Sequence, residues 1–192
     1  MPKVRLEAFS DGVVAILITI MVLELHVPDG SSWHALQHEL PAVLAYVLSF
    51  VYLGIYWNNH HHMLAAVSRI DGMTLWANLH LLFWLSLIPF TTAWMSERRF
   101  PATPTALYGV VLLAAGIAYL ILQAALLRAE GEDSRLRGAL GSDLKGKLSA
   151  VLYCLAIGST FAERWVGVAL YVVVALVWLV PDRRFERALT GR

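Results

Sequence analysis

Charged and hydroxyl-bearing side chains stand at the start of a long apolar segment near the N-terminus. Arg5, Glu7, Ser10 and Asp11 lead into residues 12–23, where Thr19 is the one polar side chain. Placing a charge within a membrane helix is costly, so such a charge usually marks either function or a buried polar network. We therefore expect this segment to carry the chemistry of the chain.

The spacing of these residues gives the helix two different faces. An α-helix turns about 100° per residue, so Thr19, Ile20 and Leu23 project within about 60° of Ile16. Asp11 projects about 140° away from Ile16, on the back of the helix. The pattern predicts an apolar front with a single hydroxyl and a polar back near one end. On periodicity alone, such a front is also typical of ordinary helix packing.

Two later apolar segments offer partners for the polar back. The first segment starts, the second ends and the third starts on one side of the membrane, so their polar residues share one depth. An unpaired buried carboxylate is costly, so we expect Ser10 and Asp11 to bond to both neighbouring helices of their own subunit. Arg5 is expected to help neutralise Asp11. The candidate partners are Trp57, His60, Trp76 and Asn78.

Three consecutive histidines at residues 60–62 suggest two further hypotheses, metal binding and proton conduction. Neighbouring helical residues point about 100° apart, so the three rings cannot easily chelate one ion. No Cys or Glu with metal-ligand spacing accompanies them, and no resident metal site is predicted. Histidine does titrate near neutral pH. A proton-conducting pathway or transporter that uses Asp11 and this cluster is therefore the alternative function.

The composition is that of a membrane protein. Of the 192 residues, 58% are hydrophobic and 15% are charged, against about 45–50% and about 25% in soluble chains. A net charge of +1 does not indicate a nucleic-acid partner. The chain reads as a single six-helix transmembrane domain over residues 1–192. The predicted helices cover residues 4–25, 40–60, 74–95, 105–127, 148–162 and 165–180; the last two form either a tight hairpin or a re-entrant pair.

Basic residues set the expected orientation. With six spans and both termini on one side, every Lys and Arg except Arg98, Arg99 and Arg164 lies on that side. The positive-inside rule therefore predicts that both termini are cytoplasmic. The longest loop, residues 128–146, is then cytoplasmic as well.

Several familiar motifs are missing from the sequence. There is no Thr-Val-Gly-Tyr-Gly loop, so a carbonyl-lined potassium filter of the usual kind is excluded. No P-loop, dinucleotide fingerprint or His-Glu-x-x-His motif is present. No paired catalytic carboxylates or nucleophile elbow indicate an enzyme, and no cofactor is expected.

Three motifs together resemble one known family. They are FSDGVVAILITIMVLEL from residue 9, YWNNHH from residue 56 and WANLHLLFWLSLIPFTTAW from residue 76. In this order, on the first three predicted helices, they closely resemble the transmembrane protein 175 family of potassium channels in its bacterial single-repeat form. The resemblance is strong over roughly residues 5–100, whereas the last two helices match in hydropathy only.

The resemblance implies a fold, a function and a site. It implies an all-α homotetramer whose first helix lines a central pore, in the bacterial inner (plasma) membrane among lipids. Ile16, Ile20 and Leu23 match the family's apolar constriction, and Thr19 matches a hydroxyl layer. The expected function is a passive, potassium-selective cation channel with a hydrophobic gate, and K⁺ is the permeating ion.

Overall fold

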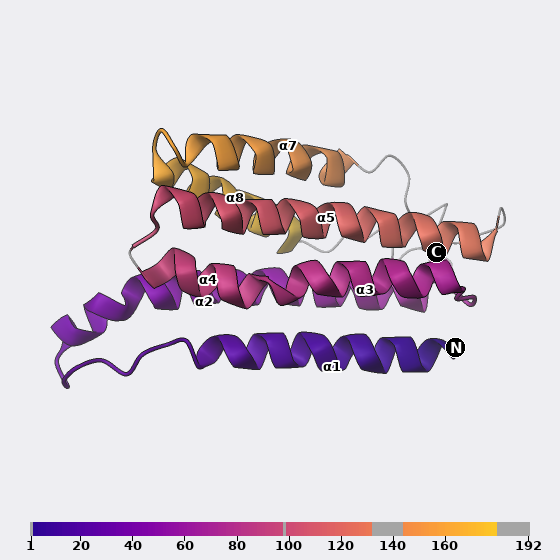
Figure 1. The fold of residues 1–192 in the computed structure, drawn as a ribbon, viewed down its shortest axis with the longest axis horizontal. Coiled ribbons are helices and arrows are strands. Elements are labelled where there is room, and N and C mark those ends of the chain that lie inside the picture. The colour runs from indigo at the N-terminus through magenta and orange to yellow at the C-terminus, as the bar shows by residue number, and fades with distance from the viewer. Residues whose placement is uncertain (1, 98, 132–143, 180–192) are drawn as a thin grey trace.

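The computed structural model describes residues 2–97, 99–131 and 144–179, and all regular secondary structure in these ranges is α-helical (Figure 1). The prediction of an all-helical chain is therefore confirmed. The helices are α1 (Lys3–Val22), α2 (Trp33–Ala65), α3 (Gly72–Ser86), α4 (Ile88–Glu97), α5 (Ala102–Glu130), α7 (Leu144–Ser159) and α8 (Arg164–Leu179).

All helix bounds differ from the predicted ones by at least one residue, and the largest differences are in two helices. The second helix begins at Trp33 instead of residue 40, because the Ser32 hydroxyl accepts a hydrogen bond from the Ala35 backbone N–H and caps the helix. The third predicted helix is divided at Leu87 into α3 and α4. Residue 180, the predicted end of the last helix, lies outside the described residues, as does most of the loop over 128–146.

Pro89 explains the division between α3 and α4. Proline lacks a backbone N–H and therefore cannot bond to the carbonyl four residues earlier. Just before the proline, the Leu87 backbone N–H bonds to the Trp84 carbonyl, three residues earlier, at 3.2 Å. The Ser86 hydroxyl donates to the Phe83 carbonyl at 2.7 Å, so it does not take over the freed acceptor at residue 85.

Three stretches of the described chain are long and apolar enough to cross a bilayer. They are Trp33–Ala65, Gly72–Glu97, which combines α3 and α4, and Ala102–Glu130. The helix α8 is apolar but shorter. The helix α1 has 20 residues, about the length that a bilayer requires, but Arg5, Glu7 and Asp11 make its first half too charged for a purely apolar span.

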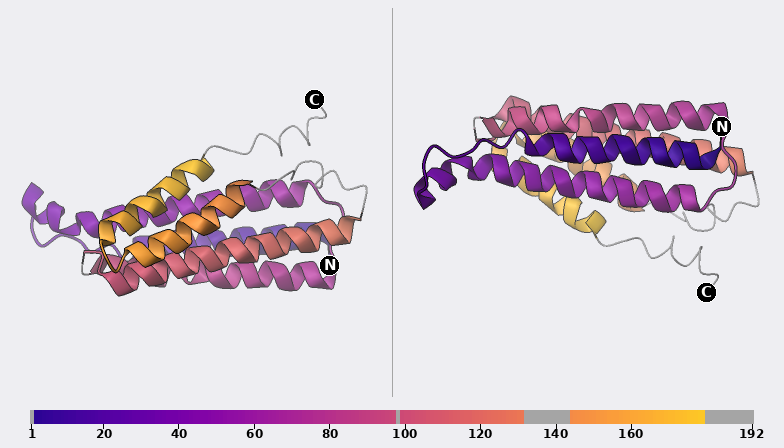
Figure 2. Two further views of the ribbon diagram at one scale, coloured as in Figure 1. Left: turned by 90° about the horizontal axis from the view of Figure 1, so that it is seen from above. Right: turned by 90° about the horizontal axis from the view of Figure 1, so that it is seen from below.

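The helices form a layered bundle with α1 at one edge. In Figure 1, α5 lies between α7 and α3–α4, and α1 lies beyond α2 and α3–α4. The helix α8 passes behind α5 and packs against α2, α5 and α7. The view from below in Figure 2 shows α1 running along the surface beside α2 and α3. The start of α1, the α2–α3 connection and the end of α5 lie at one end of the bundle (Figure 1).

Polar contacts fasten that end of the bundle. The Glu130 carboxylate at the end of α5 accepts hydrogen bonds from the Ser68 backbone N–H, at 2.9 Å, and from the Arg69 backbone N–H, at 3.3 Å. Asp71 caps α3, and hydrogen bonds from the Thr74 backbone N–H and hydroxyl hold the pKa of the Asp71 carboxyl below its ordinary value. The α2–α3 connection is thus joined to the end of α5 and to the start of α3.

Glycine permits the closest helix contacts in the core. The fully buried Tyr171 ring of α8 lies directly on the backbone of Gly109 in α5, where a Cβ would come within 2.6 Å of the ring carbon Cζ. The Tyr171 hydroxyl donates to the Thr105 carbonyl at 3.1 Å, and Tyr171's own carbonyl accepts from the Tyr52 hydroxyl at 2.6 Å. One tyrosine therefore joins α8 to both α5 and α2.

We predict that Gly109→Ala lowers the thermal stability of the detergent-solubilised protein by about 1–3 kcal/mol, because its methyl group overlaps the Tyr171 ring. Circular dichroism during heating measures the change. The control is Gly158→Ala in α7, where no atom lies within 4 Å of the added Cβ. Equal melting temperatures for the two variants would contradict the close contact.

Candidate pore helix and its polar support

The helix α1 buries one narrow face against its own subunit. Its neighbours are α2, α3 and α4. The buried residues are Leu6, Ser10, Val14, Leu17 and Met21. Their spacing of four, four, three and four residues follows one side of a helix.

The opposite face of α1 is apolar and is not covered by any of the described residues. Ile16 is 59% exposed, Leu23 is 78% exposed, and Ile20 and Phe9 are also exposed. These residues fall on the same side as Thr19, in agreement with the helical projection. An exposed apolar face of this length must meet lipid or another protein surface.

The Thr19 hydroxyl has a defined orientation. It donates to the carbonyls of Ala15 and Ile16, both at 3.0 Å. Since the hydroxyl proton is held by the helix backbone, the oxygen lone pairs are left on the exposed side. This hydroxyl is therefore suited to accept a hydrogen bond or to contact a cation.

A directed chain of hydrogen bonds supports the buried face. His60 Nε2 donates to Asn78 Oδ1 at 2.7 Å, because an amide oxygen can only accept. Asn78 Nδ2 donates to Ser10 Oγ at 3.0 Å, and Ser10 Oγ donates to the Leu6 carbonyl at 2.9 Å. The chain thus links α2, α3 and α1, and all three side chains are buried.

Asp11 belongs to a separate contact. The Trp57 indole N–H donates to Asp11 Oδ1 at 2.9 Å, and the same indole stacks on His61 with ring centroids 6.2 Å apart. Asp11 is exposed in the subunit, whereas the sequence analysis expected it to be buried. The reason is geometric: residues 10 and 11 point about 100° apart, so only Ser10 faces the bundle.

Arg5 and Trp76 lie outside the network that the sequence predicted. Arg5 is exposed and forms no ion pair with Asp11 in the described part of the chain. Six residues separate the two, which places them about 120° apart around the helix and about 9 Å apart along it. Trp76 is 75% exposed, because it points about 160° away from the buried Asn78 two residues later.

The sequence did not predict a hydrogen bond that attaches the start of α1 to the end of α2. The Lys3 ammonium donates to the Val67 carbonyl, just beyond α2, at 3.0 Å, and lies 3.8 Å from the Glu7 carboxylate. The i,i+4 spacing of Lys3 and Glu7 could have indicated their ion pair. The contact with residue 67 could not be foreseen, because it depends on where α2 ends.

The histidines at residues 60–62 have separate contacts. Within residues 2–97, 99–131 and 144–179, no group of three His, Cys, Asp or Glu side chains converges as a metal ion would require. His60 is bonded to Asn78 and His61 is stacked on Trp57, so these two neighbours already serve different parts of the polar support.

The sequence that forms these helices is similar to the sequences of known proteins. The sequence profile described as "Endosomal/lysosomal potassium channel TMEM175" matches residues 5–89, which include most of α1 and all of α2 and α3. A potassium channel of Chryseobacterium sp. (strain P1-3) is 53% identical over 189 residues, which cover 98% of each chain. The chain belongs to the TMEM175 family. A second bacterial TMEM175 relative, a potassium channel of Streptomyces collinus, is 33% identical over 91% of this chain and 90% of its own.

A solved TMEM175 structure has the same fold. It is the crystal structure of a "lysosomal potassium-selective channel TMEM175 homolog" from Chamaesiphon minutus, which is 28% identical to this chain. The two superpose with a TM-score of 0.79, over 94% of this chain and 97% of the other. The bundle described above is therefore the TMEM175 fold over nearly its whole length.

We predict that Asn78→Leu lowers stability by about 1–3 kcal/mol, because the buried His60 N–H loses its acceptor. Thermal unfolding in detergent provides the measurement. Trp76→Phe, two residues away and exposed, is the control and should change stability by less than about 0.5 kcal/mol. If Asn78→Leu were as stable as this control, the hydrogen-bond chain would not hold α1.

Proposed function

We propose that this chain forms a homotetrameric potassium channel of the bacterial plasma membrane, in which α1 of each subunit lines a central pore. Each chain is one six-helix unit surrounded by lipid. Ile16, Ile20 and Leu23 form the apolar constriction, and Thr19 contributes a hydroxyl layer. Potassium passes down its gradient, and no resident cofactor takes part.

The observation that carries this proposal is the uncovered apolar face of α1. The helix is fastened to its subunit by the opposite face, while Ile16, Ile20 and Leu23 project away from the bundle. Four such faces around an axis would surround a narrow apolar channel. The extensive similarity to proteins named as potassium channels supports the same arrangement.

An apolar constriction controls ions through water. A narrow apolar ring tends to empty of water and thereby blocks ion passage until the ring widens. Potassium holds its hydration shell less tightly than sodium, so partial dehydration costs it less. The oxygen of Thr19, whose proton is held by the backbone, can replace part of the lost hydration. Selectivity then comes from hydroxyl oxygens instead of a carbonyl filter.

The distribution of basic residues supports cytoplasmic termini. Lys3, Arg5, Arg69 and Arg128 lie on segments at one end of the bundle, where α1 starts, α2 joins α3 and α5 ends (Figure 1). At the other end, Arg99 lies on the connection between α4 and α5, and Arg164 is the first residue of α8. By the positive-inside rule, the first end faces the cytoplasm.

The proton-pathway alternative finds less support in the geometry. The chain from His60 through Asn78 ends at the Leu6 carbonyl, which is a backbone acceptor, and it does not reach Asp11. Asp11 bonds instead to an indole N–H, which does not release its proton near neutral pH. These contacts suit a structural support better than a relay.

Thr19→Val keeps the shape of the side chain but removes its oxygen. We expect the preference for potassium over sodium to fall about fivefold, which corresponds to ~1 kcal/mol. Bi-ionic reversal potentials in reconstituted membranes measure the preference. Thr91→Val is the matched control, because the Thr91 hydroxyl also donates to two backbone carbonyls but is buried inside the subunit. Unchanged selectivity in Thr19→Val would refute a role in ion contact.

Ile16→Asn should wet the constriction and raise resting potassium flux into liposomes by about tenfold or more. The control is Val151→Asn on α7. The Val151 side chain is 56% exposed, nearly as much as that of Ile16, but it lies far from α1 in sequence. This substitution should leave potassium flux unchanged. Native mass spectrometry should give the mass of four subunits for both variants. Equal flux in both would place the gate elsewhere.

Asp11→Asn separates the channel from the proton pathway. The amide oxygen still accepts from the Trp57 indole, so we expect potassium flux to persist within about twofold of the unmodified protein. A proton relay through Asp11 predicts instead that proton flux vanishes. Potassium and proton fluxes measured at two pH values decide the question, and selective loss of proton flux would favour the relay.

A further inference from the structure

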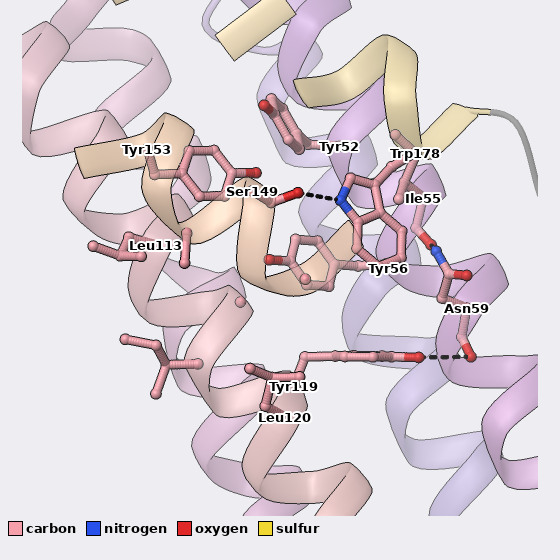
Figure 3. Close-up of a pocket in the computed structure, with 14 residues that line it drawn as sticks. Tyr52, Ile55, Tyr56, Asn59, Leu113, Tyr119, Leu120, Ser149, Tyr153 and Trp178 are labelled. Carbon is pink, nitrogen blue, oxygen red and sulfur yellow. Dashed lines mark hydrogen bonds between the residues drawn. The ribbon is translucent and has the colours of Figure 1, made fainter. Parts of the chain in front are cut away.

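A small pocket lies inside each subunit, away from α1. It is lined by residues of α2, α5, α7 and α8, is partly open to the outside and has a volume of about 70 Å³. Figure 3 shows the aromatic rings of Tyr56, Tyr119 and Trp178 around it. On α2, Tyr52, Ile55, Tyr56 and Asn59 line the pocket at the spacing of one helical face.

The size of the pocket limits its occupant. A cavity needs about 10–15 Å³ by this measure to hold one water molecule, and an engineered cavity of about 150 Å³ binds benzene. The pocket therefore suits a molecule of about three to five heavy atoms. The mainly aromatic and aliphatic lining favours an apolar body.

One polar atom of the lining, Asn59 Oδ1, has no hydrogen-bond partner among the described residues. Asn59 is only 7% exposed, and its Nδ2 donates to the Ile55 carbonyl at 2.9 Å. In the part of the chain that the structure describes, Asn59 Oδ1 accepts no hydrogen bond. A buried amide oxygen without a partner is costly, so this atom calls for a donor.

Three hydrogen-bond donors of the lining are already used. The Tyr56 hydroxyl donates to the Leu112 carbonyl at 3.4 Å, and the Trp178 indole N–H donates to Ser149 Oγ at 2.7 Å. The Ser149 hydroxyl in turn donates to the Lys145 carbonyl at 2.8 Å. The lining therefore offers an acceptor at Asn59 and an apolar wall, but no carboxylate to bind a cation.

We propose that this pocket binds a small neutral molecule with an apolar body and one hydrogen-bond donor, of the class of short-chain alcohols. Its hydroxyl donates to Asn59 Oδ1, and its carbon atoms lie against the aromatic rings. The pocket shares α2 with the polar support of α1, since Trp57 and His60 project toward α1 and α3 from the same turns.

The test uses 2-bromoethanol with the full-length protein in detergent, in a Cys154→Ser background so that the bromide meets no thiol. Bromine quenches indole fluorescence, and Trp178 lines the pocket. We expect saturable quenching that disappears in Trp178→Phe. Bromoethane, which lacks the hydroxyl, should bind about threefold to tenfold more weakly. Asn59→Leu should weaken the binding of 2-bromoethanol by the same factor and leave the binding of bromoethane unchanged.

Filling the pocket provides a second variant. A Cβ on Gly116 would lie 3.8 Å from the Tyr56 hydroxyl, so Gly116→Leu places its side chain in the pocket without a backbone clash. Saturable quenching should vanish in this variant and persist in Gly158→Leu, which adds the same side chain in open space. Quenching that rises linearly in all variants would overturn the proposal and assign the space to water or to another part of the chain. The fluorescence readout does not depend on ion conduction.

Discussion

The hydrogen bond from Asn78 to Ser10 decides which way α1 faces, and the proposed pore depends on that choice. The helix has apolar side chains on most of its circumference, so hydrophobicity alone does not select one face for the bundle. Within a membrane, lipid tails satisfy apolar side chains as well as other helices do, and polar contacts and close packing set the orientation. Once Ser10 is bound to α3, Ile16, Ile20 and Leu23 must point away from the subunit.

The same physics explains the rest of the bundle. Tyr171 reaches two other helices only because Gly109 leaves room for its ring, and Gly167 brings α8 close to the Ala156 carbonyl of α7. Small residues that allow backbones to approach, together with interhelical hydrogen bonds, are the usual means of joining membrane helices. These contacts leave α5 and its neighbours as a stable frame, against which α1 is held by four buried apolar side chains and a few polar groups.

This division of roles fits a channel that belongs to the TMEM175 family. The back of α1 is held by a buried amide, a hydroxyl and a histidine, and Lys3 and Trp57 fasten it further at the same end. The front carries a single hydroxyl whose proton is turned inward. A pore built from such fronts would select ions by the cost of removing water, and its width would follow the angle at which the polar back holds the helix.

The sequence by itself determined the helical class, the two faces of α1 and the family, because hydrophobic periodicity and ordered motifs are local properties. It also placed Ser10, His60 and Asn78 at one depth. Only the tertiary structure decided which polar residues meet. Ser10 is buried while its neighbour Asp11 is exposed, and Asn78 is buried while Trp76 is not, because each pair points in different directions from its helix. The rotation of one helix against another depends on packing over the whole interface, which no short motif records. The same holds for the pocket beside Asn59, since four helices distant in sequence contribute its walls.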